Sequence, residues 1–247
     1  MQPATICGAD PLVRGRRPRR PGFGCGYAAL WGSAMRCQSA MTKLLVTVDI
    51  VLFTIRDRRI ELLLIKRLAK PFEHRYALPG GFVLEDESLE AAAARELHEE
   101  TGVDKVYLEQ LYTFGDPKRD PRGRVITVAY YALVPRPQAL HSGTDASDAA
   151  WFPVTALPPL AFDHRKIVEY AHQRLRNKLD YTNVGFELLP AKFTLGELQI
   201  VHEAILGQDL DKRNFRRKIV QKGIVKLLKE WQQTGRKPAQ LYRFTRN

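Results

Sequence analysis

The segment that most constrains the fold runs from Gly81 to Val103 and reads GFVLEDESLEAAAARELHEETGV. Its alanine-rich second half predicts a helix that begins after Ser88, a favoured N-cap residue. The helix should end at Gly102, a residue type favoured just past a helix end. Three glutamates at spacing i, i+3 and i+4 would share one face of this helix. We call them the carboxylate cluster: Glu96, Glu99 and Glu100.

The carboxylate cluster is unfavourable for a helix without a ligand. Like charges at this spacing repel each other, and the last turn of a helix already carries partial negative charge. A helix that is merely solvent-exposed usually mixes charges of both signs, which this face does not. A bound divalent cation would resolve the conflict, and carboxylate oxygens suit Mg²⁺ or Mn²⁺. A magnesium or manganese site is therefore expected here, with an unliganded surface helix as the alternative.

The same segment resembles the Nudix box, and it matches that motif at the family's spacing. The resemblance implies a Nudix fold, with a mixed sheet between helices, and hydrolysis of a nucleoside diphosphate linked to another group. It also implies catalytic roles for Glu87, Arg95, Glu99 and Glu100, and metal ligation by the carboxylate cluster. Glu87 and Arg95 would support the geometry of the loop and helix. Any of the glutamates could act as the base. The matching positions are Gly81, Glu87, Arg95, Glu96, Leu97, Glu99, Glu100, Gly102 and Val103.

The sequence around the box predicts strands and a charged loop. Residues 43–55 and 60–67 are apolar and β-branched, and a short polar turn separates them, so they predict an antiparallel pair. Residues 105–115 and 123–134 predict two further strands. The loop between these, with the sequence GDPKRDPRG before a Tyr-rich strand, resembles the ADP-ribose-handling branch of the family. Gly81, Arg119 and Arg122 are the candidate ligand-binding residues, because a guanidinium can pair with phosphate as a forked donor. A solvated charged loop is the alternative.

Charge is distributed unevenly along the chain. The formal net charge is +12, and residues 161–247 hold 18 basic against 9 acidic residues, whereas residues 41–160 hold 15 against 17. A basic C-terminal segment predicts a polyanionic partner for that segment. All three cysteines lie within residues 1–40, which fits a folded part in a reducing cytoplasm. The best apolar run is shorter than the roughly 20 residues of a membrane span. Residues 1–40 read as a disordered tail or a misassigned start.

The C-terminal segment predicts a winged helix-turn-helix. An amphipathic helix is expected over residues 162–179. Thr194 and Glu197 form a capping-box pair for a second helix that ends at Gly207, and Asp211 would cap a third, basic helix. A terminal hairpin follows. Cations neutralise phosphates, and Arg and Asn also read base edges. A surface helix with spare charge is the alternative. The candidate DNA-binding residues are Lys212, Arg213, Asn214, Arg216, Arg217, Lys218, Arg236 and Lys237.

Together the two halves resemble the Nudix-related transcriptional regulators of NAD metabolism, of the NrtR type. The stretches that carry this are FDHRKIV, GFELLPAKFTLGELQIVHEAILG, LDKRNFRRKI and GRKPAQLYRF. The resemblance implies an α+β chain, with an α/β/α Nudix sandwich over 41–160 and a winged helix-turn-helix over 161–247. It further implies a homodimer that binds a palindromic operator, represses NAD or sugar genes, and releases DNA when ADP-ribose binds.

The complete box leaves hydrolysis expected, unlike the broken boxes of many such regulators. Two other functions stay open. One is a Mg²⁺-dependent ADP-ribose pyrophosphatase whose C-terminal domain is not a specific DNA binder. The other is an RNA-processing Nudix enzyme.

Overall fold

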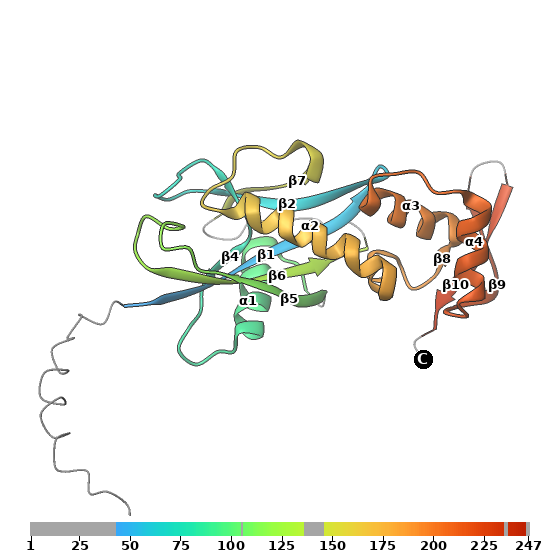
Figure 1. The fold of residues 1–247 in the computed structure, drawn as a ribbon, viewed down its shortest axis with the longest axis horizontal. Helices are drawn as coiled ribbons and strands as arrows, with labels where there is room; N and C mark the ends of the chain where they lie inside the picture. Colours follow the sequence, from blue (N-terminus) through green and yellow to red (C-terminus); the bar gives the residue numbers. More distant parts are fainter. Residues whose placement is uncertain (1–42, 105, 136–145, 235–236, 246–247) are drawn as a thin grey trace, which may run out of the picture. The chain divides into compact units, whose positions relative to one another are not determined.

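The computed structural model describes residues 43–104, 106–135, 146–234 and 237–245. Its first part is a mixed sheet of seven strands in the order β3-β2-β1-β6-β5, with β4 paired to β1 and β7 paired to β2 (Figure 1). The strands are β1 (Leu45–Arg56), β2 (Arg59–Arg67), β3 (Tyr76–Ala77), β4 (Gly80–Phe82), β5 (Tyr107–Phe114), β6 (Val125–Leu133) and β7 (Ala146–Pro153). All strands predicted from the sequence are present.

The centre of the sheet is β1, which is buried over most of its length. It pairs antiparallel with β2 and parallel with β6, which makes the sheet mixed. A two-residue turn joins β1 to β2, with Asp57 at φ 48° and Arg58 at φ 60°. Positive φ at both central residues gives the turn the twist that a hairpin needs. The predicted antiparallel pair is therefore confirmed.

Two helices cover opposite faces of this sheet, α1 (Leu89–Thr101) and α2 (His164–Tyr181) (Figure 1). Because side chains alternate along a strand, β1 supplies both faces. Val48, Ile50 and Leu52 pack in a cluster with the buried side of α1, whereas Val51 and Phe53 pack in the cluster that includes α2. The predicted α/β/α sandwich with a mixed sheet is confirmed.

The C-terminal part is a winged helix with a three-stranded sheet in the order β8-β10-β9. The predicted capping box is present: the Thr194 hydroxyl accepts from Glu197 N–H, and the Glu197 carboxylate accepts from Thr194 N–H. The Asp211 carboxylate caps the next helix, as predicted, by accepting from Asn214 N–H. The elements are α3 (Leu195–Leu206), α4 (Lys212–Gln221), β8 (Phe193–Thr194), β9 (Val225–Thr234) and β10 (Lys237–Phe244).

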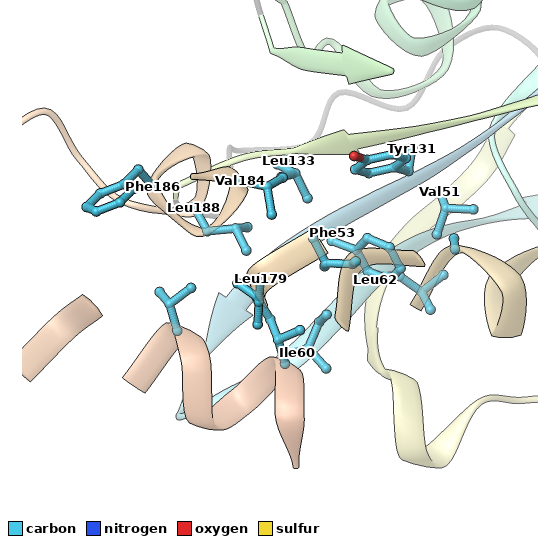
Figure 2. Close-up of a cluster of buried hydrophobic side chains, with 14 of the residues drawn as sticks. Val51, Phe53, Ile60, Leu62, Tyr131, Leu133, Leu179, Val184, Phe186 and Leu188 are labelled. Carbon is cyan, nitrogen blue, oxygen red and sulfur yellow. The ribbon is translucent and has the colours of Figure 1, made fainter. Parts of the chain in front are cut away.

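One apolar core runs from the sandwich into the winged helix. In Figure 1, α2 runs across the sheet toward α3, and a 3-10 helix, η2 (Val184–Leu188), follows it. Figure 2 shows side chains of both parts packed together. They are Phe53, Ile60, Leu62 and Leu133 from the sheet, with Leu179, Val184, Phe186 and Leu188 from α2 and η2. The helix α2 is thus a structural element shared by both parts.

A second contact between the two parts is polar. Arg58, in the turn between β1 and β2, donates to Glu203 of α3 at 2.8 Å. The Glu203 carboxylate also accepts from Leu210 N–H in the turn before α4. The predicted domain boundary near residue 160 falls just before α2 and stays a prediction. Within the described ranges, the structure contains no helix long and apolar enough to span a membrane.

Candidate functional site

Local signals place the carboxylate cluster as predicted. The Ser88 hydroxyl caps α1 by accepting from Ala91 N–H, and Gly102 ends the helix in the left-handed region at φ 71°. The strand β4 crosses directly over the cluster at Gly81. A Cβ atom on Gly81 would lie only 2.3 Å from Glu96 Oε1, so a larger residue at this position would require the Glu96 side chain to move.

Arg95 ties the loop before α1 to the carboxylate cluster. Its Nη1 donates to Glu96 Oε1 at 2.8 Å and to Glu99 Oε2 at 3.0 Å. Its other face donates to both oxygens of Glu87, at 2.6 and 3.0 Å, and to the Phe82 carbonyl. The hydrogen bonds from Arg95 and from the backbone N–H of Leu84 lower the pKa of Glu87 to about 2. Glu87 and Arg95 thus make the loop–helix contact expected of them.

Burial raises the pKa of two glutamates of the carboxylate cluster, Glu96 and Glu100. The pKa of Glu100 rises to about 8 against the opposing hydrogen bond from Gly80 N–H at 2.8 Å. The neighbouring charges of Glu96 and Asp49 raise the pKa of Glu100 further. The site therefore favours any positive charge that can replace the proton.

The carboxylate cluster has the donor chemistry for a divalent cation. Hard cations such as Mg²⁺ take carboxylate oxygens, and a cation could take the place of the proton that burial favours on Glu100. In the described part of the chain, however, no three His, Cys, Asp or Glu side chains stand ready as a ligand set. Arg95 supplies the positive charge in this arrangement. Metal ligation would require Glu96 and Glu99 to turn away from Arg95, whereas Glu100 accepts from Gly80 N–H. Ligation of a metal by Glu96, Glu99 and Glu100 stays a prediction.

The carboxylates face a pocket with a volume of about 490 Å³. It lies between β1, β4, α1, the loop after β5 and the start of α2. Glu96 and Glu100 line it together with several basic and aromatic side chains, so it offers both charge signs to a ligand. The lining includes Gly81, Phe82, Arg67, Arg119, Asp120, Arg122, Phe162 and His164.

Both candidate phosphate-binding arginines line this pocket, but each is already paired. Arg122 donates to Asp120 at 2.7 and 3.0 Å, and its guanidinium lies 5.2 Å from the Phe82 ring centre and 5.5 Å from that of Phe162. Arg119 is buried and donates to two carboxylates. Arg119 is therefore not the solvated side chain of the alternative interpretation, whereas Arg122 is exposed. Their roles toward a ligand, like that of Gly81, stay predictions.

The partners of Arg119 were not predicted from the sequence. Its Nη2 donates to Asp49 on β1 at 3.2 Å and to Asp163, just before α2, at 2.9 Å. Next to them, His164 Nδ1 accepts from Leu78 N–H at 2.9 Å, and burial lowers the pKa of this histidine, which keeps it neutral. The available signal was Asp49 itself, a carboxylate within a largely apolar strand.

The candidate nucleic-acid interface lies on α4. Phe215 and Ile219 are buried, and they hold the helix against the core. Lys237 begins β10 and is exposed, whereas Arg236 lies outside the described residues. The predicted side chains of α4 are all exposed: Lys212, Arg213, Asn214, Arg216, Arg217 and Lys218. The helix therefore presents a basic face to solvent, and its contacts with DNA stay predictions.

Two family models match the chain, the NUDIX domain over residues 43–171 and the NrtR DNA-binding winged helix domain over residues 185–244. The ADPR responsive transcriptional repressor NtrR of Acinetobacter baylyi is 42% identical over 206 residues, covering 81% of this chain and 82% of that protein. The ADP-ribose pyrophosphatase of Methanocaldococcus jannaschii is 44% identical over 109 residues, covering 44% of this chain and 64% of that enzyme.

Two crystal structures of Shewanella oneidensis NrtR are also similar. The complex with a 27mer DNA has a TM-score of 0.73 and 40% identity, covering 81% of this chain and 93% of that chain. The NUDIX domain complexed with ADP ribose has a TM-score of 0.52 and 43% identity, covering 56% of this chain and 92% of that chain. The likeness therefore extends over both parts of the described fold.

The raised pKa of Glu100 predicts a pH-dependent stability in the absence of metal. Between the ordinary glutamate value of 4.5 and about 8, the folded protein keeps the Glu100 proton that the unfolded chain has lost. Stability should therefore fall as pH rises through this window, by up to about 1.4 kcal/mol per pH unit. Chemical denaturation in EDTA from pH 5 to pH 9 measures this slope, and Glu100→Gln should flatten it. Parallel profiles for the two proteins would contradict the assignment.

Proposed function

We propose the function of this chain from its family: it belongs to the NrtR family, in which a Nudix domain is joined to a DNA-binding winged helix domain. The chain is an ADP-ribose-responsive transcriptional repressor that binds double-stranded DNA through its winged helix and ADP-ribose through its Nudix domain. One observation carries this proposal. A pocket suited to a pyrophosphate and a basic helix are connected through one continuous core.

The pocket fits the chemistry of ADP-ribose. A pyrophosphate is a forked acceptor, and guanidinium groups are its matching donors. We assign Arg119 and Arg122 to the phosphates and Gly81 to the close approach of the ligand to β4. A divalent cation, Mg²⁺ or Mn²⁺, would be held by Glu96, Glu99 and Glu100. When bound, such a cation neutralises phosphate oxygens and lowers the pKa of a coordinated water.

Hydrolysis of the ligand is a second part of the proposal. The box residues are complete, and Glu87 and Arg95 hold the loop on the helix as a hydrolase requires. We therefore expect conversion of ADP-ribose and water into AMP and ribose 5-phosphate. The base is one of the glutamates of the box. A pyrophosphatase without specific DNA binding is the alternative. The similarity to the Methanocaldococcus jannaschii pyrophosphatase favours this alternative, but it concerns the Nudix part alone. The basic winged helix favours the regulator.

The winged helix supplies the DNA contacts in this proposal. A basic helix with an apolar inner face can enter the major groove while its cations meet phosphates. We assign this role to α4, and we place the hairpin of β9 and β10 alongside as the wing. A homodimer would place two such helices on a palindromic operator of NAD or sugar genes. The protein would then act in the cytoplasm, where that DNA lies.

The repressor function predicts that ADP-ribose weakens DNA binding. A suitable probe is a duplex enriched by the wild-type protein from a random-sequence library. A mobility-shift titration of this duplex should give a lower affinity when ADP-ribose is present, because ligand and DNA favour different states of the protein. The function is wrong if no sequence is enriched, or if the affinity is the same with and without ADP-ribose. Stronger binding to RNA than to the duplex would instead indicate an RNA-processing enzyme.

Substitution of Arg217 tests the assignment of α4. Its exposed guanidinium lies beside Asn214, to which it donates at 2.9 Å. Arg217→Ala should weaken binding to the enriched duplex by about 1–3 kcal/mol if the side chain reads a base. The matched control is Arg165→Ala, which removes the same charge from an exposed position on α2. Equal affinities for Arg217→Ala and wild type would place that residue outside the interface.

Glu100→Gln tests hydrolysis. The substitution preserves the shape of the side chain and removes the negative charge that a metal ligand requires. Release of AMP from ADP-ribose in the presence of Mg²⁺ should be measurable for wild type and absent for the variant. The control is Glu90→Gln, an exposed glutamate in the first turn of the same helix. Turnover that survives in Glu100→Gln would exclude Glu100 as a metal ligand or base.

A further inference from the structure

The ligand pocket and the start of α2 meet at a buried ion-pair cluster. Arg119 lies between two carboxylates: Asp49, which lines the pocket, and Asp163, the residue before α2. Arg119 holds Asp163 with two hydrogen bonds, Nη2 to Oδ1 at 2.9 Å and Nε to Oδ2 at 3.2 Å. The exposed fractions of these side chains are only 3% for Arg119, 9% for Asp49 and 12% for Asp163. Water therefore screens the cluster weakly, and its pairing matters energetically.

Asp163 differs from the residues that precede the other three described α-helices. Ser88, Thr194 and Asp211 have extended backbones, with ψ of 161°, 153° and 117°, and their side chains each accept from a backbone N–H of the first turn. Asp163 is an equally good capping residue by type. Its backbone is nevertheless at φ −96° and ψ 18°, and its side chain makes no capping hydrogen bond. The Asp163 carboxylate accepts hydrogen bonds from Arg119 instead of capping α2.

An anionic ligand would compete for the same guanidinium. Arg119 lines the pocket and Asp163 is not among the lining residues, so a pyrophosphate in the pocket can reach Arg119. Phosphate and carboxylate offer the same forked acceptor geometry. If Arg119 turns to the ligand, a nearly buried carboxylate loses its partner, which is unfavourable. The first turn of α2 offers the nearest replacement donors, provided the backbone at 163 becomes extended as it is at the other three caps.

The other end of α2 transmits such a change to the winged helix. Leu175 and Leu179 are buried in the shared core with η2 and α3. His172 of α2 donates from Nε2 to the carbonyl of Ile205 in the last turn of α3, at 3.2 Å. The helix α2 therefore contacts the pocket at its first turn and the helix-turn-helix along its second half.

We propose that the Arg119–Asp163 ion pair is the switch that couples the Nudix pocket to the winged helix. In the paired state, Asp163 bonds Arg119 and α2 holds the arrangement that binds DNA. In the ligand-bound state, Arg119 bonds the anion and Asp163 caps α2. The backbone at the start of α2 then changes its conformation. Asp163 is thus a positioning residue and touches neither ligand. This inference rests on the proposed function, because it supplies the route by which ADP-ribose regulates DNA binding.

Substitution of Asp163 should change the affinity for DNA and the affinity for ADP-ribose in opposite directions. Asp163→Asn cannot hold Arg119 as an ion pair but can still cap α2, so it favours the ligand-bound state. Relative to wild type, the variant should bind the enriched duplex at least about fivefold more weakly without ligand and bind ADP-ribose more tightly, since coupling between sites is commonly 5–150-fold. Fluorescence anisotropy measures the first affinity and calorimetry without DNA measures the second. The control is Asp180→Asn, an exposed position near the end of α2.

The possible results separate the switch from a structural role. The switch would be supported if Asp163→Asn weakens binding to the duplex and strengthens binding to ADP-ribose. Asp163→Glu, which keeps the carboxylate, should bring both affinities back toward the wild-type values. Unchanged affinities, or a joint loss of both, would overturn it. If Asp163→Asn fails to fold, Asp163→Ser, which keeps a favoured capping side chain, should give the same two changes. Wild-type DNA binding that ignores ADP-ribose would instead overturn the proposed function itself, and the switch with it.

Discussion

The geometry of the site depends on one guanidinium among carboxylates. Arg95 bonds Glu87 on one side and Glu96 and Glu99 on the other. These bonds hold the loop on α1 and place Gly81 against Glu96, which forms one wall of the pocket. They also offset negative charges that would otherwise repel one another on a single helix face. A metal ion bound with a pyrophosphate can also neutralise these glutamates. The Gly81–Val103 segment can therefore both hold the fold together and respond to a ligand.

Local chemistry made much of the fold predictable from the sequence. The caps of three helices, at Ser88, Thr194 and Asp211, depend on residues within one turn of each other. The turn of the β1–β2 hairpin likewise depends on adjacent residues. The Nudix box places Gly81, Glu87, Arg95 and the carboxylate cluster within one continuous segment, so the contacts among them were also foreseeable. The basic outer face of α4 followed from helical spacing around Phe215 and Ile219.

The sequence did not reveal contacts between distant segments. Arg119 is 70 positions from Asp49 and 44 from Asp163, and only the sheet and the start of α2 bring the three together. The loop that holds Arg119 and Arg122 consequently looked like a set of free phosphate donors, whereas both side chains are paired with carboxylates. The parallel pairing of β1 with β6 is equally non-local. These long-range contacts link the pocket to α2, and through α2 to the winged helix.

In the proposed switch, one equilibrium governs both ligand binding and DNA binding. Two sites that share an equilibrium must affect each other by the same factor. Calorimetric titration of ADP-ribose into the full chain, first alone and then saturated with its enriched duplex, tests this most directly. DNA should lower the affinity for ADP-ribose by the same factor by which ADP-ribose lowers the affinity for DNA. An ADP-ribose affinity that is the same with and without DNA would contradict it.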